Sequence, residues 1–173
     1  MSSLNRRKFM AGASLAVMAG LLATRHGIAA DGTKKEVFEV TKTEEEWKAI
    51  LTPKQFDVLR KHGTERAFSS PLNDEHRDGI FACAACDLPL YSSETKFDSG
   101  TGWPSFYDHL PNAIGTSEDR SWYFAVRTEV HCRRCGGHLG HVFDDGPAPT
   151  GLRYCMNGVA MQFHPGPTKP QAS

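Results

Sequence analysis

The chain has 173 residues, and its 20 Lys and Arg balance 20 Asp and Glu, so the formal net charge is zero. Residues 1–30 hold four of the basic residues and no acidic one, which leaves 16 basic and 20 acidic residues in residues 31–173. This balance excludes the basic stripe with which proteins bind nucleic acid or an anionic membrane surface. Residues 31–173 have the length of one domain.

The first 30 residues have the layout of an export signal. A basic start is followed by an apolar stretch from about Met10 to Ala23 and by small residues ending at Ala30, as in secretory signals. The stretch is shorter than the ~20 residues of a membrane span. Residues 5–10, Asn-Arg-Arg-Lys-Phe-Met, resemble a twin-arginine signal; an ordinary secretory signal is the alternative. We expect an exported, periplasmic protein, with cleavage after Ala30 or retention as an anchor left open.

Two short helices are expected at the start of the domain. Each begins with a threonine capping box, formed by Thr43 with Glu46 and by Thr52 with Gln55. A proline occupies the first helical position of the second helix, and Gly63 is a stop signal. Apolar residues at helical spacing predict the buried faces: Trp47, Ile50, Leu51, Phe56 and Leu59.

Short β-prone runs follow Pro71, separated by glycine, proline and aspartate. In one of them, Trp122, Phe124 and Val126 alternate with their neighbours, which predicts a half-buried strand. We predict a mainly antiparallel β domain with N-terminal helices, a core of about 43–165 and a loose C-terminal tail. The predicted runs are Ile80–Ala82, Leu88–Tyr91, Trp122–Val130, Val142–Phe143, Leu152–Met156 and Val159–Phe163.

Four of the five cysteines form two C-x-x-C pairs, Cys83 with Cys86 and Cys132 with Cys135. Two such turns can complete a tetrahedron around Zn²⁺, and four protein ligands leave no position for substrate, so the ion would be structural. Two disulfides or a redox pair are the alternatives. A protein exported in the folded state can carry zinc that protects its thiolates, and two matched pairs exceed what a redox motif requires. We therefore predict one structural zinc ion.

The fifth cysteine, Cys155, has no such pattern. An unpaired cysteine in an exported protein needs an explanation, and it is either a small buried apolar residue or a nucleophile. The residues alone leave both interpretations open. On a strand, Arg153 shares the face of Cys155 and would favour the thiolate, or it forms a structural ion pair.

Several segments resemble the motifs of the methionine-R-sulfoxide reductase (MsrB) family. They are residues 96–106 (KFDSGTGWPSF), 138–147 (HLGHVFDDGP) and 153–157 (RYCMN), and residues 63–68 resemble the N-terminal segment of the family. The resemblance covers about residues 46–163. It implies two antiparallel sheets with short N-terminal helices and a zinc site at one side. It also implies thiol-dependent reduction of the R epimer of methionine sulfoxide, free or in proteins.

The resemblance also implies roles for individual residues. Cys155 matches the nucleophile, and Trp103 matches the tryptophan that packs against the substrate methyl group and offers its indole N–H. His138 and His141 match active-site histidines that could protonate the sulfoxide oxygen, and Asn157 could donate a hydrogen bond to it. The paired cysteines match the zinc ligands.

Each of these residues also has a structural interpretation. Trp103 could be a core residue, the histidines could support the metal turn, and one histidine could only orient the other. The remaining histidines are assigned no role: His26, His62, His76, His109, His131 and His164.

The chain departs from a common family pattern at Thr101, where many members carry a second redox cysteine. With four cysteines on zinc, no thiol remains to resolve the Cys155 sulfenic acid internally. The hypothesis is that an external thiol, such as a thioredoxin-like protein, reduces it. A milder departure is the segment 158–161, Gly-Val-Ala-Met, where serine and alanine are usual.

We expect the protein to be a monomer.

Two rival functions remain. The first is a zinc-supported β module that binds peptides without turnover, for which a nucleophilic Cys155 would be superfluous. The second is a zinc hydrolase, which is disfavoured because a four-cysteine site has no open position and the sequence has no HExxH cluster.

Overall fold

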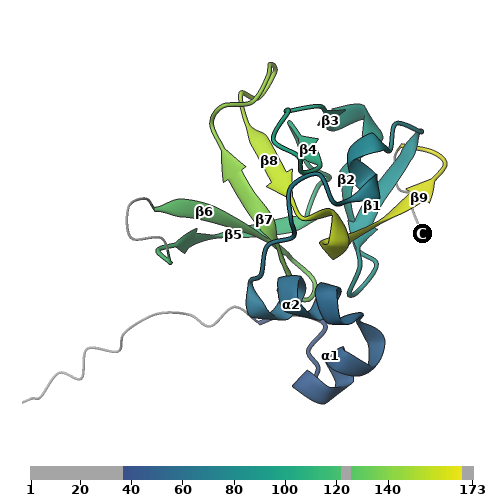
Figure 1. Cartoon of the computed structure of the whole chain (residues 1–173), viewed down its shortest axis with the longest axis vertical. Helices are drawn as coiled ribbons and strands as arrows, with labels where there is room; N and C mark the ends of the chain where they lie inside the picture. The colour runs from purple at the N-terminus through teal and green to yellow at the C-terminus, as the bar shows by residue number, and fades with distance from the viewer. Residues whose placement is uncertain (1–36, 122–125, 169–173) are drawn as a thin grey trace, which may run out of the picture. The chain divides into compact units, whose positions relative to one another are not determined.

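The computed structural model describes residues 37–121 and 126–168 (Figure 1). The predicted export signal in residues 1–30 lies outside the described residues, as do the first half of the run predicted at 122–130 and the end of the tail. In the described part of the chain, no helix has the length and apolar character needed to cross a bilayer. The boundary between signal and domain therefore stays a prediction.

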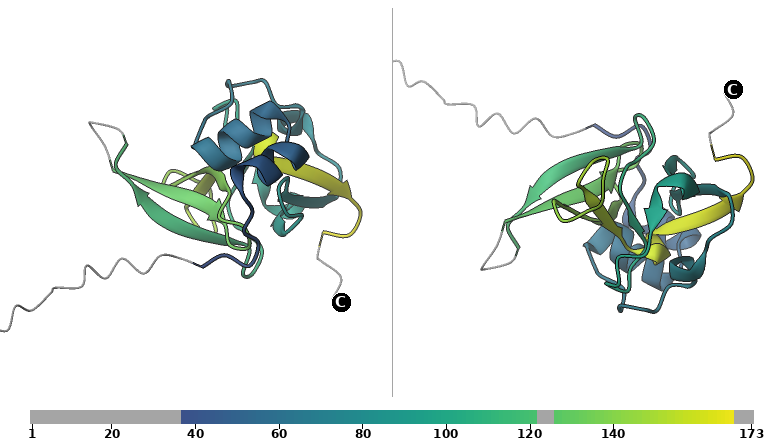
Figure 2. Two further views of the ribbon diagram at one scale, coloured as in Figure 1. Left: turned by 90° about the horizontal axis from the view of Figure 1, so that it is seen from below. Right: turned by 90° about the horizontal axis from the view of Figure 1, so that it is seen from above.

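Both predicted helices are present, and they lie together at one end of the β structure (Figures 1 and 2). They are α1 (Glu44–Ile50) and α2 (Pro53–Lys61). Thr43 and Thr52 each cap their helix with the reciprocal hydrogen bonds of a capping box, to Glu46 and Gln55.

The faces and ends of the helices differ in two details from the prediction. Trp47, Leu51, Phe56 and Leu59 are buried as predicted, whereas Ile50 is 56% exposed because it lies on the outer side of α1. The left-handed residue that ends α2 is His62, with φ of 56°, one position before Gly63.

The strands form two antiparallel sheets, which confirms the predicted fold class. The smaller sheet has the order β2-β1-β9 and the larger sheet the order β3-β4-β8-β7-β6-β5. The strands are β1 (Gly79–Cys83), β2 (Pro89–Ser92), β3 (Lys96–Phe97), β4 (Ser105–Phe106), β5 (Ile114–Asp119), β6 (Arg127–Cys132), β7 (His138–Phe143), β8 (Arg153–Met156) and β9 (Met161–Pro165). The described residues also form three 3-10 turns: η1 (Pro71–Asp74), η2 (Ser93–Thr95) and η3 (Gly158–Ala160).

The strand predictions were wrong where the pattern of apolar residues in the sequence differs from the observed pairing of strands. β5 was not predicted because its residues are mostly polar, yet it pairs with β6 over six residues. Val126 is 60% exposed and precedes β6, so its predicted inner position is wrong. The run predicted at 159–163 is divided, because η3 occupies Gly158–Ala160 before β9 starts.

An aromatic cluster joins the two sheets on their inner faces. Phe106 of β4 stacks on Tyr91 of β2 with ring centroids 4.3 Å apart, and it meets the edge of Phe81 of β1 at 5.0 Å. All three side chains are fully buried, and burying each stabilises the fold by about 1.5–3 kcal/mol. The hydroxyl of Tyr91 donates to Sδ of Met156 at 3.0 Å. The cluster therefore fixes β4 and β8, the strands that carry or flank Cys155.

Candidate metal centre and active site

The two C-x-x-C pairs form two similar turns, each at the end of a strand. β1 ends at Cys83, whose carbonyl accepts a hydrogen bond from the N–H of Asp87 at 2.8 Å. β6 ends at Cys132, whose carbonyl accepts the N–H of Gly136 at 2.8 Å. Asp87 and Gly136 both have positive φ, 57° and 65°. A Cβ at Gly136 would lie 2.4 Å from Phe38, so this turn requires glycine.

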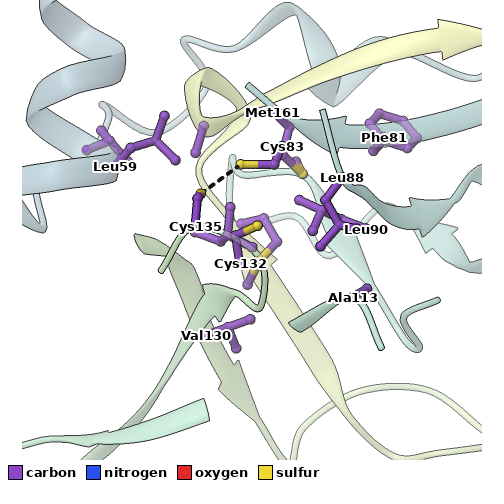
Figure 3. Packing of buried hydrophobic residues seen from close by; sticks show 14 of the residues in the cluster. Leu59, Phe81, Cys83, Leu88, Leu90, Ala113, Val130, Cys132, Cys135 and Met161 are labelled. Atoms are coloured by element: carbon purple, nitrogen blue, oxygen red, sulfur yellow. Dashed lines mark hydrogen bonds between the residues drawn. The ribbon is translucent and has the colours of Figure 1, made fainter. Parts of the chain in front are cut away.

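The four sulfur atoms converge at the junction of the two sheets. Figure 3 shows three of these cysteines, Cys83, Cys132 and Cys135, close to one another. All four Sγ atoms lie within 4.8 Å of one another, with 3.8 Å between Cys83 and Cys135 and 3.5 Å between Cys86 and Cys132. Tetrahedral Zn–S bonds of about 2.3 Å place sulfurs about 3.8 Å apart, whereas a disulfide requires about 2.05 Å. The predicted ligands thus have the geometry of a metal site, consistent with structural zinc, and all five cysteines are free of disulfides.

The second cysteine turn is tied to the helices. Both terminal nitrogens of the Arg60 guanidinium, at the end of α2, lie 3.1 Å from the carbonyl oxygen of Cys135. The same guanidinium lies 4.7 Å from the ring centroid of Trp47 on α1. The helices therefore hold the turn that leads directly into β7.

Cys155 lies in β8 between two strands that bring functional side chains beside it. Its Cα pairs with that of Ser105 on β4 and with that of His141 on β7. A pocket of about 160 Å³ opens here, smaller than the ~300 Å³ at which drug-sized pockets begin. Four of the five predicted active-site residues line it: Cys155, Trp103, His141 and Asn157. The pocket is also lined by Thr64, Gly140 and Phe143, which lie in the segments quoted for the family but were assigned no role, and by Arg127, which no motif indicated.

Trp103 is half-buried and forms one wall of this pocket. Its indole Nε1 donates a hydrogen bond to the backbone carbonyl of Glu65 at 3.1 Å. The indole N–H that we expected to serve as a polar contact is thus engaged by the protein itself. The ring remains available as an apolar surface.

Asn157 directly follows β8 and is buried. Its Oδ1 accepts the backbone N–H of Glu65 at 2.9 Å, and its Nδ2 donates to the carbonyl of Leu139 at 3.0 Å. The side chain lines the pocket and also anchors the Glu65 loop to β7.

Glu65 is a residue that the sequence reasoning passed over, although it lies in the segment 63–68 quoted for the family. Its carboxylate accepts the backbone N–H groups of Gly158 and Val159, the latter at 3.0 Å. Burial raises the pKa of Glu65, and these hydrogen bonds partly oppose that shift. Glu65 thus holds together the tryptophan wall, Asn157 and the turn after β8.

His141 is held by a carboxylate. Its Nε2 lies 2.8 Å from Oδ2 of Asp119 on β5, and Asp119 also accepts Nη2 of Arg127 at 2.6 Å. Burial lowers the pKa of His141, although the hydrogen bond to Asp119 opposes that shift. A lowered pKa favours the neutral imidazole near pH 7, in which one nitrogen donates and the other accepts.

His138 is buried and does not line the pocket. Its Nδ1 lies 2.7 Å from Oε1 of Glu129, and its ring centroid lies 5.4 Å from that of His141. Each of the two histidines is thus held by a carboxylate of its own, His138 by Glu129 and His141 by Asp119. The partner carboxylates, Asp119 and Glu129, were missed because no pattern in the sequence indicated that β5 and β6 pair beside β7.

The environment of the Cys155 thiol is mixed. Burial raises its pKa, whereas the Thr101 hydroxyl, with Oγ1 3.9 Å from Sγ, and the charge of Arg153 lower it. Arg153 is itself paired with Asp145 through two hydrogen bonds of 2.8 and 2.9 Å. The structural ion pair expected of Arg153 is therefore present. The positive charge of Arg153 acts on Asp145 as well as on the Cys155 thiolate.

Comparison with known proteins agrees with this geometry. The SelR domain family matches residues 51–165. The chain is 58% identical over 125 residues to a peptide methionine sulfoxide reductase MsrB of Methanosarcina barkeri, covering 72% of this chain and 87% of the relative. The chain belongs to the MsrB family of peptide methionine sulfoxide reductases.

Bacterial members of the MsrB family are similarly close. The Agrobacterium fabrum protein is 51% identical over 127 residues, covering 73% of this chain and 94% of the relative. The Pseudomonas entomophila protein is 52% identical over 127 residues, covering 73% of this chain and 97% of the relative. The MsrB proteins are oxidoreductases, so membership confirms the predicted enzyme class.

The raised pKa of Cys155 predicts how its reactivity depends on pH. Alkylation by iodoacetamide requires the thiolate, so its rate should rise with pH throughout the neutral range and level off only above pH 9, the ordinary pKa of the thiol. Thr101→Val removes a hydrogen bond that lowers this pKa, and should slow alkylation at pH 8. Mass spectrometry of the labelled Cys155 peptide measures both, with Cys155→Ser as the blank. A rate that levels off below pH 7 would contradict the raised pKa.

Proposed function

We propose that this chain reduces the R epimer of methionine sulfoxide, free or within proteins, to methionine, with Cys155 as the nucleophile. The observation that carries the proposal is the pocket of about 160 Å³ in which Cys155, His141, Asn157 and Trp103 meet. Its size suits a single side chain rather than a large ligand. The relatives of this chain are named peptide methionine sulfoxide reductases.

In the proposed reaction, the sulfur of Cys155 attacks the sulfoxide sulfur and finally carries its oxygen. The S–O bond of the substrate breaks, and the products are methionine and a Cys155 sulfenic acid. The sulfoxide sulfur is reduced by two electrons and the cysteine sulfur is oxidised by two. The thiol proton balances the step by ending on the transferred oxygen.

His141 is the proposed carrier of that proton. It lines the pocket, and its Cα pairs with that of Cys155 on the neighbouring strand. A neutral imidazole can accept the thiol proton and pass it to the sulfoxide oxygen, which becomes more basic as the S–O bond weakens. Asp119 fixes the ring through Nε2. His138 is proposed to act on His141 through the contact between their rings. Trp103 and Phe143 are proposed to enclose the S-methyl group of the substrate.

Reduction of the sulfenic acid is proposed to need an external thiol, such as a thioredoxin-like protein. The four other cysteines lie together in the metal centre. The position beside Cys155 holds the Thr101 hydroxyl, which is hydrogen-bonded to Ser99 at 2.8 Å and cannot form a disulfide. The external thiol would attack the sulfenic sulfur, release water and leave a mixed disulfide, which a second thiol then reduces.

Cys83, Cys86, Cys132 and Cys135 are proposed to hold one zinc ion with a structural role. Three of the thiols are buried, and four thiolates in one buried place require a cation to neutralise them. Zinc has no redox chemistry of its own and in a four-thiolate site has no open position. It would therefore take no part in the reaction.

The proposed setting is the repair of exported proteins. The basic, apolar and small-residue order of residues 1–30 and the paired Arg6 and Arg7 support export by the twin-arginine route to the periplasm. Transport in the folded state would preserve a bound zinc. The enzyme is proposed to act as a monomer.

The activity is tested on residues 31–173 with R and S methionine sulfoxide offered separately and dithiothreitol as reductant. Only the R epimer should be reduced. Cys155→Ser should lower the rate by more than about 10³-fold, because it removes the nucleophile, and His141→Gln by about 10²-fold or more. His76→Gln, an exposed histidine, is the matched control and should be unchanged. Folded protein that reduces neither epimer would favour the rival binding module.

The recycling proposal is tested by Thr101→Cys. One equivalent of substrate without reductant should leave wild type with a sulfenic acid that dimedone traps. The variant should instead form a disulfide between position 101 and Cys155 and resist dimedone. The side-chain atoms of Thr101 and Cys155 are already 3.9 Å apart, which a modest shift would bring to bonding distance. Thr101→Val is the control: it lacks a second thiol, so its sulfenic acid should still be trapped by dimedone. A wild-type disulfide to any metal-centre cysteine would contradict an external thiol.

The zinc proposal is tested by metal analysis and thermal unfolding. The purified protein should hold one zinc ion per chain, and Cys83→Ser or a strong chelator should lower the Tm, because metal binding contributes to folding free energy. Cys155→Ser should keep its zinc and its Tm. Unchanged stability after complete removal of the metal would disprove the structural role.

The export proposal is tested with the full chain expressed in a bacterium that has the twin-arginine translocase. Fractionation should find the shortened protein in the periplasm, and the double substitution Arg6→Lys, Arg7→Lys should keep it in the cytoplasm. Export of the doubly substituted chain would show instead that residues 1–30 act as an ordinary secretory signal.

A further inference from the structure

A second group of metal-ligating side chains lies beside the pocket, apart from the four cysteines. His62 ends α2, Glu129 lies on β6 and His138 begins β7. One ligand atom from each side chain lies within 4.8 Å of the other two. The Nδ1 atoms of His62 and His138 approach the same carboxylate oxygen, Oε1 of Glu129, at 3.1 and 2.7 Å. Three separate elements thus direct their ligand atoms to one point.

The donor set is one that divalent transition metals use. Two imidazoles and a carboxylate bind Zn²⁺ with bonds of about 2.0–2.2 Å and leave a fourth position for water. The other oxygen of Glu129, Oε2, accepts the Ser117 hydroxyl at 2.7 Å. Such an outer contact orients a ligating carboxylate and leaves Oε1 facing the two imidazoles.

His62 takes the left-handed conformation, with φ of 56°, although Gly63 follows it directly and would adopt that conformation at no steric cost. Unfavourable backbone conformations of non-glycine residues often mark functional positions. Here the conformation accompanies an imidazole directed at Glu129. The His62 side chain is 63% exposed, so an ion and its water can reach the group from solvent.

We propose that His62, Glu129 and His138 form a second, exchangeable site for a divalent transition metal, for which Zn²⁺ is the probe. The site is distinct from the four-cysteine centre, in which three of the four thiols are buried. Because the ring of His138 lies 5.4 Å from that of His141, the site would border the reductase pocket. Its existence does not depend on the proposed function. The competing interpretation is a carboxylate that only accepts hydrogen bonds from two histidines.

The test is calorimetric titration of Zn²⁺ into protein that already holds one zinc ion per chain. The measurements use residues 31–173 with Cys155→Ser, so that the free thiol cannot bind the added metal. This protein should bind one further equivalent. Adding His62→Ala should abolish that binding, because two ligands remain. His62 is exposed at the end of α2, so the variant should fold, and circular dichroism and the retained first zinc confirm this.

Two further variants make the result specific. Glu129→Gln keeps the size of the side chain but removes its charge, and should weaken the second zinc at least tenfold. His76→Ala removes an exposed histidine elsewhere and should leave the second zinc unchanged. No second equivalent, or a second equivalent that survives both His62→Ala and Glu129→Gln, would overturn the proposal.

Discussion

The convergence of four cysteine sulfurs is the constraint on which the rest of the structure depends. β1 of the smaller sheet and β6 of the larger sheet each end in a cysteine turn, and the turns meet sulfur to sulfur. The second turn leads within three residues into β7, which carries His138 and His141. Arg60 binds the carbonyl of Cys135 and brings the helices to the same point. Any loosening of this junction would move the strand beside Cys155.

The pocket depends on a second, purely polar junction around Glu65. The backbone carbonyl of Glu65 accepts the Trp103 indole N–H, and the backbone N–H of Glu65 donates to Asn157. The Glu65 carboxylate accepts two backbone N–H groups of the turn after β8. Buried polar groups of this kind stabilise a structure only when their partners are all present. Trp103 and Asn157 therefore use hydrogen bonds to hold the pocket in shape. The proposed proton transfer involves Cys155 and His141 instead.

The sequence was informative where structure follows from near neighbours. The capping boxes at Thr43 and Thr52 and both cysteine turns were predicted because each is decided within four residues. It was uninformative where a residue distant in sequence determines the structure. The sequence did not indicate the contacts of Asn157 and Trp103 with Glu65, which lies 92 and 38 residues away in sequence. β5 was missed because its pairing with β6, rather than apolar alternation, makes it a strand.

The same burial that suits the pocket to an apolar methyl group works against a free thiolate. Burial raises the pKa of Cys155, and the opposing contacts are a threonine hydroxyl and an arginine already paired with Asp145. Burial also lowers the pKa of His141, so both groups are biased towards their neutral forms. A neutral pair can still carry out the proposed reaction, because the thiol proton is the one that the departing oxygen needs. In the proposed reaction, the pocket therefore does not have to stabilise a Cys155 thiolate and a protonated His141 before substrate binds. Cys155 would ionise only as the substrate accepts its proton.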